Sequence, residues 1–132
     1  MSAPCTTEMR TGMAHSVLAE VGTLLQALAE HGENGSIDLR SLPLTEADRQ
    51  ELEKLLGRGE VKIDLEVAGR SEIWETGYPG AWWIRHRGAG DKISSEEIAI
   101  CPAPEILAAH PDDIRAAAER ITQDIRAYTT SN

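Results

Sequence analysis

The chain has 132 residues, of which 41% are hydrophobic and 27% are charged, as expected for one globular domain that buries a core without disulfides or metal. Its formal net charge of −9 disfavours binding to a nucleic-acid backbone, which requires a basic face, and favours a partner with a basic patch. No apolar run is long enough to span a bilayer and the first ten residues contain no apolar signal core, so we expect no membrane insertion and a cytoplasmic protein.

The first half of the chain has the spacing of two helices. Apolar residues recur three and four positions apart from Val17 to Leu28, which predicts the first helix. A short extended piece follows at 37–39. Thr45, with Asp48 three residues later, is a hydroxyl N-cap followed by an acid near the positive end of a helix, and this pair predicts the start of the second helix.

Strand patterns occupy the middle of the chain, and a third helix follows them from residue 111 to residue 128. The strand patterns lie at residues 60–67, 72–76, 81–87 and 97–101. This order predicts an α+β fold, with an antiparallel sheet of about four strands and helices packed mainly on one face. We expect residues 1–14 to be a flexible lead and residues 15–132 to form a single domain.

The second hairpin contains all three tryptophans, beside a Gly-Tyr-Pro-Gly turn, in a chain that has no phenylalanine. With residues 77–80 as a four-residue loop, Glu75 faces Trp82 and Trp74 faces Trp83. Because side chains alternate between the two faces of a sheet, Trp74 and Trp83 share one face and Trp82 lies on the other.

The turn before this hairpin decides which face is inside. A three-residue loop at 68–70 groups the apolar residues of the preceding strand with Trp82, and leaves Trp74 and Trp83 outside among charged residues. A two-residue loop reverses the hairpin, so that Trp74 and Trp83 are core and Trp82 is outside. We favour the first register because it separates polar from apolar residues better, and both registers place an aromatic residue on the outward face.

The aromatic cluster has two interpretations. Outward tryptophans flanked by charge are typical of recognition surfaces, which predicts partner binding through the hairpin. Tryptophans in a hairpin more often pack in the core, and composition alone favours that interpretation. The predicted partner-binding residues are Trp74, Glu75, Thr76, Tyr78, Pro79, Gly80, Trp82 and Trp83.

Residues that could carry chemistry are scattered. The four histidines have no metal-ligand spacing, and the two cysteines, Cys5 and Cys101, lie far apart, so we expect free thiols in a reducing compartment and no metal or cofactor. No glycine-rich phosphate loop is present. We therefore expect no enzymatic activity. A metal- or iron–sulfur-handling protein that uses cysteine and histidine is the alternative, and a homodimeric structural module is another.

Several stretches carry a resemblance to a known family. They are S-I-D-L-R-S-L-P-L-T-E-A-D, L-G-R-G-E-V, I-W-E-T-G-Y-P-G-A-W-W-I, and I-C-P-A-P-E-I-L with P-D-D-I. Over residues 15 to 128 the chain resembles the C-terminal domain of the HupH/HyaF hydrogenase expression and formation proteins.

The resemblance implies an accessory role in the maturation of a membrane-bound uptake nickel–iron hydrogenase, as an assembly factor or chaperone. The implied partners are a hydrogenase subunit precursor or other maturation proteins. A homodimer formed through the tryptophan face is a further possibility. No catalytic residues are implied.

Overall fold

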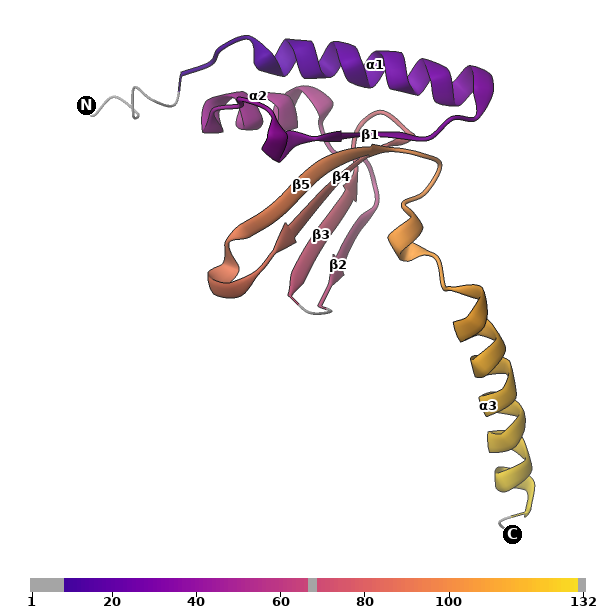
Figure 1. Cartoon of the computed structure of the whole chain (residues 1–132). Coiled ribbons are helices and arrows are strands. Elements are labelled where there is room, and N and C mark those ends of the chain that lie inside the picture. Colours follow the sequence, from indigo (N-terminus) through magenta and orange to yellow (C-terminus); the bar gives the residue numbers. More distant parts are fainter. Residues whose placement is uncertain (1–8, 67–68, 131–132) are drawn as a thin grey trace.

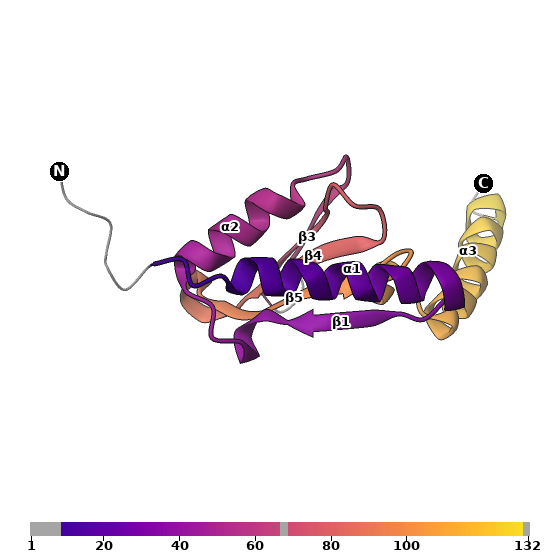
Figure 2. The ribbon, with the colours of Figure 1, turned by 90° about the horizontal axis from the view of Figure 1, so that it is seen from above.

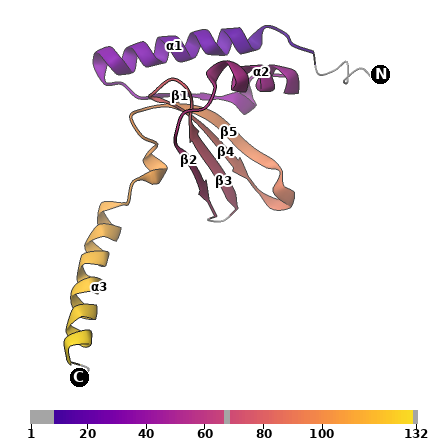
Figure 3. The same ribbon diagram turned by 180° about the vertical axis from the view of Figure 1, so that it is seen from behind.

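The structure is a computed structural model that describes residues 9–66 and 69–130 of the chain. Two helices, α1 (Met13–His31) and α2 (Glu46–Leu56), lie against each other on one face of an antiparallel sheet (Figure 1). Seen from above, these two helices form one layer over the strands (Figure 2). The third helix, α3 (Pro111–Thr130), extends away from both layers, as the view from behind also shows (Figure 3).

The sheet confirms the predicted α+β class, but it has five strands instead of about four. In spatial order they are β1 (Gly35–Asp38), β5 (Ile93–Ile100), β4 (Ala81–Arg87), β3 (Arg70–Glu75) and β2 (Lys62–Leu65), and every pair is antiparallel. The additional strand is β1, which overlaps the short extended piece predicted at 37–39 and pairs with β5. Four residues are too few for an alternating pattern to stand out, so its pairing could not be predicted from its own sequence.

The two covering helices form for reasons that are local to their sequences. In α1, the buried residues Ala14, Val17 and Val21 recur at helical spacing, and Gly32 ends the helix in the left-handed conformation at φ 68°. In α2, the predicted cap is confirmed. The Asp48 N–H donates to the Thr45 hydroxyl over 3.0 Å, and the Thr45 N–H donates to the Asp48 carboxylate over 3.1 Å.

The Asp48 carboxylate also joins the two helices. It accepts hydrogen bonds from the N–H and the hydroxyl of Thr11, at 2.7 and 2.6 Å, just before α1 begins. Burial of Asp48 opposes its ionisation, but the hydrogen bonds from Thr11 and Thr45 outweigh burial and hold the pKa of this carboxyl below its ordinary value. Residues 1–8, which make up most of the lead predicted at residues 1–14, lie outside the described residues. The start of α1 is thus held to the start of α2.

The predicted pairing within the tryptophan hairpin is confirmed, because Trp74 faces Trp83 and Glu75 faces Trp82. In the preceding hairpin, Ile63 faces Ile73, which is the grouping that we favoured. The loop between these strands includes residues 67–68, which lie outside the described residues.

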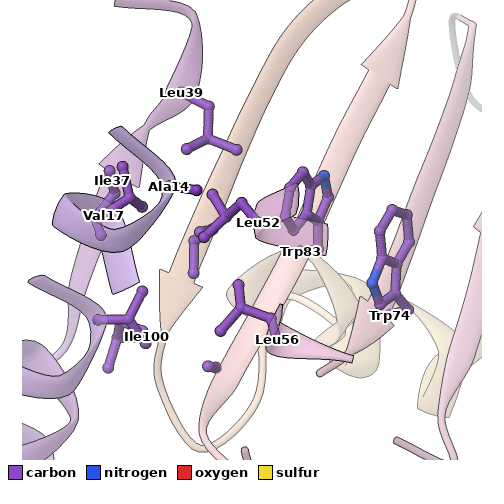
Figure 4. Packing of buried hydrophobic residues seen from close by; sticks show 12 residues of the cluster. Ala14, Val17, Ile37, Leu39, Leu52, Leu56, Trp74, Trp83 and Ile100 are labelled. Carbon is purple, nitrogen blue, oxygen red and sulfur yellow. The ribbon is translucent and has the colours of Figure 1, made fainter. Parts of the chain in front are cut away.

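Ile73, Trp82 and Ile84, predicted to lie inside, are buried, but the predicted outside of the sheet is wrong. Trp74 and Trp83 lie in the main core beneath α1 and α2, against Leu52 and Leu56, with 1% and 0% of their surfaces exposed (Figure 4). Arg85, one of the charged residues that suggested solvent on this face, is instead paired with the buried Glu96 beside the indoles, whereas Lys62, Asp64 and Glu66 are exposed. Polarity along a strand therefore misled the assignment, because it could not show which charges neutralise each other.

The third helix differs from the expectation that helices cover the sheet. Its apolar residues keep the predicted spacing, yet Ile114, Ile121 and Ile125 are each more than half exposed. The segment that leads to it contains Pro102 and Pro104 and carries the helix away from the body (Figure 1). None of the helices in the described residues combines the length and apolar character that a bilayer crossing requires.

Two leucines of α2 test the core. We expect Leu52→Ala to lower the free energy of unfolding by about 2–5 kcal/mol, because Leu52 is fully buried and its removal leaves a cavity under the helix. Leu55→Ala is the matched control: Leu55 is 38% exposed on the same helix and should lose less than about 1 kcal/mol. Urea unfolding of both variants measures the difference, and equal losses would contradict the placement of α2.

Candidate functional site

The turn of the tryptophan hairpin is closed by Thr76, which is buried. Its hydroxyl donates to the carbonyl of Ala81 over 2.9 Å and accepts from the N–H of Tyr78 over 3.1 Å. In the backbone, the Thr76 N–H donates to the same Ala81 carbonyl, and the Ala81 N–H donates to the Tyr78 carbonyl. These bonds fix residues 76–81 in one conformation without help from solvent.

The same turn is bonded to elements on both sides of it. The Gly77 N–H donates to the carbonyl of Leu56 at the end of α2, over 2.8 Å, and the Cys101 N–H donates to the carbonyl of Gly80 over 2.9 Å. Gly80 has a φ of 97°, and a Cβ there would lie 3.2 Å from a methyl carbon of Leu25 in α1. At this φ the backbone of any other residue would be strained, and its Cβ would be crowded by the Leu25 side chain of α1. Glycine is therefore required at this position.

The outer side of the turn is exposed next to α1. Tyr78 is 48% exposed and, with Leu18, Gly22 and Leu25 of α1, lines a hollow of about 130 Å³. Pro79 beside it is also exposed. We call Tyr78, Pro79 and these three α1 residues the turn surface. It combines an aromatic ring, a proline and half-buried leucines on a backbone that is held rigidly.

The three indoles are not part of that surface, so the expectation of an outward tryptophan is wrong. Trp74 and Trp83 stack with their ring centroids 5.6 Å apart and their planes at 8°. Trp82 lies on the other face of the sheet, where it is 6% exposed and its N–H donates to the Cys101 carbonyl over 3.2 Å. Glu75 beside it is half-buried. Of the eight predicted residues, the structure therefore brings Tyr78 and Pro79 to the surface and places the other six beneath or beside them.

Beside the stacked indoles lies a buried acid that the sequence argument missed. The side chain of Glu96 on β5 has no exposed surface. One of its oxygens accepts from Trp83 Nε1 over 2.8 Å and from Arg85 Nε over 2.7 Å, and the other accepts from Arg49 Nε of α2 over 3.0 Å. The alternation of S-S-E-E-I-A-I places Glu96 on the face of Ile98 and Ile100, and that alternation was the signal for a buried acid.

Two arginines offset the negative charge of Glu96. Burial of Glu96 would raise the pKa of its carboxyl, but the hydrogen bonds from Arg85, Trp83 and Arg49 outweigh burial, and its pKa lies below the ordinary value. Arg85 also approaches Glu53 of α2 at 3.2 Å and Glu72 of β3 at 3.9 Å. We call Arg49, Glu53, Glu72, Arg85 and Glu96 the charge cluster. It joins α2 to three strands.

Two arginine side chains also lie over the ring of Trp74. The guanidinium carbon of Arg58 lies 4.1 Å from the centroid of Trp74, and that of Arg85 lies 5.1 Å from it. Cation–π contacts of this kind contribute roughly 0.5–2 kcal/mol. Throughout the described residues, each buried side-chain nitrogen and oxygen has a hydrogen-bond partner. The donors and acceptors of the charge cluster thus satisfy each other, and what the site offers to a partner is the shape and apolar contact of the turn surface.

The residues considered for metal handling lie apart. Cys101 is 7% exposed, and burial, together with the negative charge of Glu97, raises the pKa of its thiol. Within residues 9–66 and 69–130, no three histidine, cysteine, aspartate or glutamate side chains are placed to hold a metal ion together. Cys5 lies outside the described residues.

Comparison with known proteins identifies the family. The C-terminal conserved region of the HupH hydrogenase expression protein matches residues 12–128, which is nearly the whole described chain. This chain belongs to the HupH family. The resemblance drawn from the hairpin motif is thus confirmed.

Two curated relatives in the HupH family are longer than this chain. It is 33% identical over 111 residues to the hydrogenase-1 operon protein HyaF of Escherichia coli K12, a match that covers 84% of this chain and 37% of HyaF. It is 28% identical over 105 residues to the hydrogenase expression/formation protein HoxQ of Azotobacter vinelandii, covering 76% of this chain and 37% of HoxQ. The chain therefore spans well under half the length of these curated relatives.

A solved HupH structure shares the fold. The hydrogenase expression protein HupH from Thiobacillus denitrificans aligns with a TM-score of 0.85 and 36% sequence identity, over 89% of this chain and 98% of that one. A likeness of this extent confirms the α+β architecture described above.

Substitution of the buried acid tests the charge cluster. We expect Glu96→Gln to lower the free energy of unfolding by about 3–5 kcal/mol near neutral pH, because two arginines lose the charge that offsets their burial. Glu97→Gln is the matched control on the opposite face of the same strand, where the side chain is half-buried, and it should cost less than about 1 kcal/mol.

The difference in stability between wild type and Glu96→Gln should also depend on pH. Because the folded-state pKa of Glu96 is depressed, its contribution is complete above the ordinary value of 4.5 and is lost as the pH falls from there through the folded-state pKa. The gap in stability between wild type and Glu96→Gln should therefore narrow in acid, as measured by denaturant unfolding across pH. A gap that stays constant as the pH falls would contradict a buried ionised carboxylate.

Proposed function

We propose that this protein is an accessory factor in the maturation of an uptake nickel–iron hydrogenase, acting as an assembly factor or chaperone and not as a catalyst. The observation that carries the proposal is membership of the HupH family, together with curated relatives named as hydrogenase expression/formation proteins. The proposed partner is a hydrogenase subunit precursor or another maturation protein. Binding, and not bond-making, is the proposed activity.

We place the partner contact at the turn surface of the hairpin. Tyrosine is enriched at protein interfaces, and Tyr78 presents its ring beside a hollow lined by leucines. The turn is held by Thr76, Gly77 and Gly80, so that little conformational freedom is lost on binding. Preorganisation of this kind supports a docking role.

The other predicted hairpin residues have an indirect part in this proposal. Trp74, Trp82 and Trp83 pack on the two faces of the sheet, and Glu75 leads into the turn, so these residues hold the turn surface in position. The formal net charge of −9 favours association with a basic surface on the partner. Substitution of the indoles would disturb the core and would not test binding by itself.

The two tyrosines of the chain provide a matched test. We expect Tyr78→Ala to weaken capture of the hydrogenase large- or small-subunit precursor by at least about tenfold, because a half-exposed aromatic anchor is lost. Tyr128→Ala is the control, since Tyr128 is 85% exposed on α3, away from the turn. Binding of purified precursors from the same organism to each variant is measured, with circular dichroism to verify folding.

Two results would contradict the proposal in different ways. Capture that is unchanged by Tyr78→Ala would remove the turn surface as the contact and leave the maturation role open to another surface. If the wild-type chain captures neither precursor nor a maturation protein, and a strain that lacks it assembles active hydrogenase normally, the proposed function itself is wrong.

A further inference from the structure

The third helix presents an apolar side to solvent. The exposed fractions of Ile114, Ile121 and Ile125 are 56%, 60% and 59%, and Tyr128 is 85% exposed. These residues recur at intervals that place them along one side of the helix, with the small residues Ala117 and Ala118 between them. We call this set, Ile114, Ala117, Ala118, Ile121, Ile125 and Tyr128, the α3 stripe. A stripe of this kind is typical of a helix that packs on another element.

The sheet has a matching surface on the face opposite α1 and α2. There Ile73, Trp82 and Ile84 form a second core, flanked by the half-buried residues Ile63 and Leu65. A groove of about 550 Å³ opens on this face, and its lining includes Ile84, Glu97, Ala99, Cys101, Pro104 and Ile106. We call it the sheet groove. Of the described elements, only the short segment Glu105–Leu107 packs on this face, whereas an apolar sheet face ordinarily lies beneath a second layer.

The two surfaces match in length. A helix of 20 residues is about 30 Å long, and the strands β4 and β5, of seven and eight residues, are about 25 Å long. Arg120 and Asp124 both border the α3 stripe, and Glu97 and Glu105 border the sheet groove, so each surface has an apolar centre with charged side chains at its rim.

We propose that a second copy of this chain occupies the sheet groove, with α3 of each copy packed on the outer sheet face of the other. Within one copy, the segment from Pro102 to Pro111 directs α3 away from its own sheet (Figures 1 and 3). When two copies exchange their α3 helices, the α3 stripe and the sheet groove of each copy are both covered, and two-fold symmetry relates the two contacts. This interface is separate from the turn surface and does not depend on the hydrogenase partner.

The exposed area is sufficient for a stable dimer. The exposed isoleucines and Tyr128 leave roughly 400 Å² of side-chain surface in water, which is within the range of the largest apolar patch on a typical monomer. Ile73, Trp82 and Ile84 are already buried, so the surface that α3 would cover on the opposite sheet comes from the lining of the groove. Because the two sides of an interface bury about equal areas, the two contacts of the exchange would bury about 1,600 Å² in total. Two α3 helices packed only on each other would bury about half of that, which favours the exchange.

A lipid surface is a poorer match for the same stripe. The helix carries four acidic and three basic side chains. Interfacial helices that bind anionic lipid have a basic polar face, so this balance gives no electrostatic attraction to a membrane.

Light scattering over a concentration series tests the dimer. We expect wild type to dimerise and Ile121→Glu to raise the dimer dissociation constant at least about 100-fold, because the substitution places a charge at both copies of the contact. Gln123→Glu is the matched control on the polar side of the same helix and should dimerise like wild type. Wild type that stays monomeric at every concentration, or Ile121→Glu that dimerises normally, would overturn the proposal.

Substitutions in the groove distinguish exchange from pairing of two α3 helices. We expect Ala99→Glu, verified for folding by its thermal transition, to abolish the dimer as Ile121→Glu does. Should Ala99→Glu fail to fold, Ile106→Glu at the exposed rim makes the same test. If the groove variants dimerise normally, helix-on-sheet exchange is wrong.

Discussion

The structure depends on how one buried carboxylate is neutralised. Glu96 lies between the helical layer and the sheet, where an unpaired charge would be too costly to keep. Arg85 and Trp83 approach it from the neighbouring strand, and Arg49 approaches it from α2. Because those donors come from separate elements, their hydrogen bonds to the acid hold α2 in place on the sheet. Mutual neutralisation explains why a face rich in charged residues can be the buried one.

The position of α2 also fixes the position of the hairpin turn. The last residues of the helix accept a hydrogen bond from the turn through the Leu56 carbonyl, and Gly80 lets the turn approach α1 closely. Tyr78 is thereby held at the junction of both helices and the sheet. The tryptophan hairpin therefore mainly serves to build this junction. Its buried residues stabilise the fold, and its exposed residues are available to a partner.

Much of this could be read from the sequence, and the failures have physical causes. Helical spacing, the Thr45 cap, the pairing of Trp74 with Trp83 and the grouping of Ile63 with Ile73 all depend on neighbours close along the chain, and all are confirmed. The inside of the sheet depends on where α1 and α2 pack, and on charges that meet from distant segments. The pairing of strand β1 was not predicted, because its partner β5 lies far away in the chain. The exposure of α3 was not predicted, because an apolar stripe indicates burial but does not indicate which surface will cover it.

The burial of the indoles has a consequence for spectroscopy. All three tryptophans lie in the packed layers, two of them stacked and one of those bonded to Glu96, and the chain has no phenylalanine. Emission from Trp74 and Trp83 therefore reports on the contact between the helical layer and the sheet, and emission from Trp82 reports on the opposite face. A red shift on denaturation reports solvent entry at these two places. The α3 helix contains no tryptophan, so far-ultraviolet dichroism, and not an indole of its own, follows its helix content.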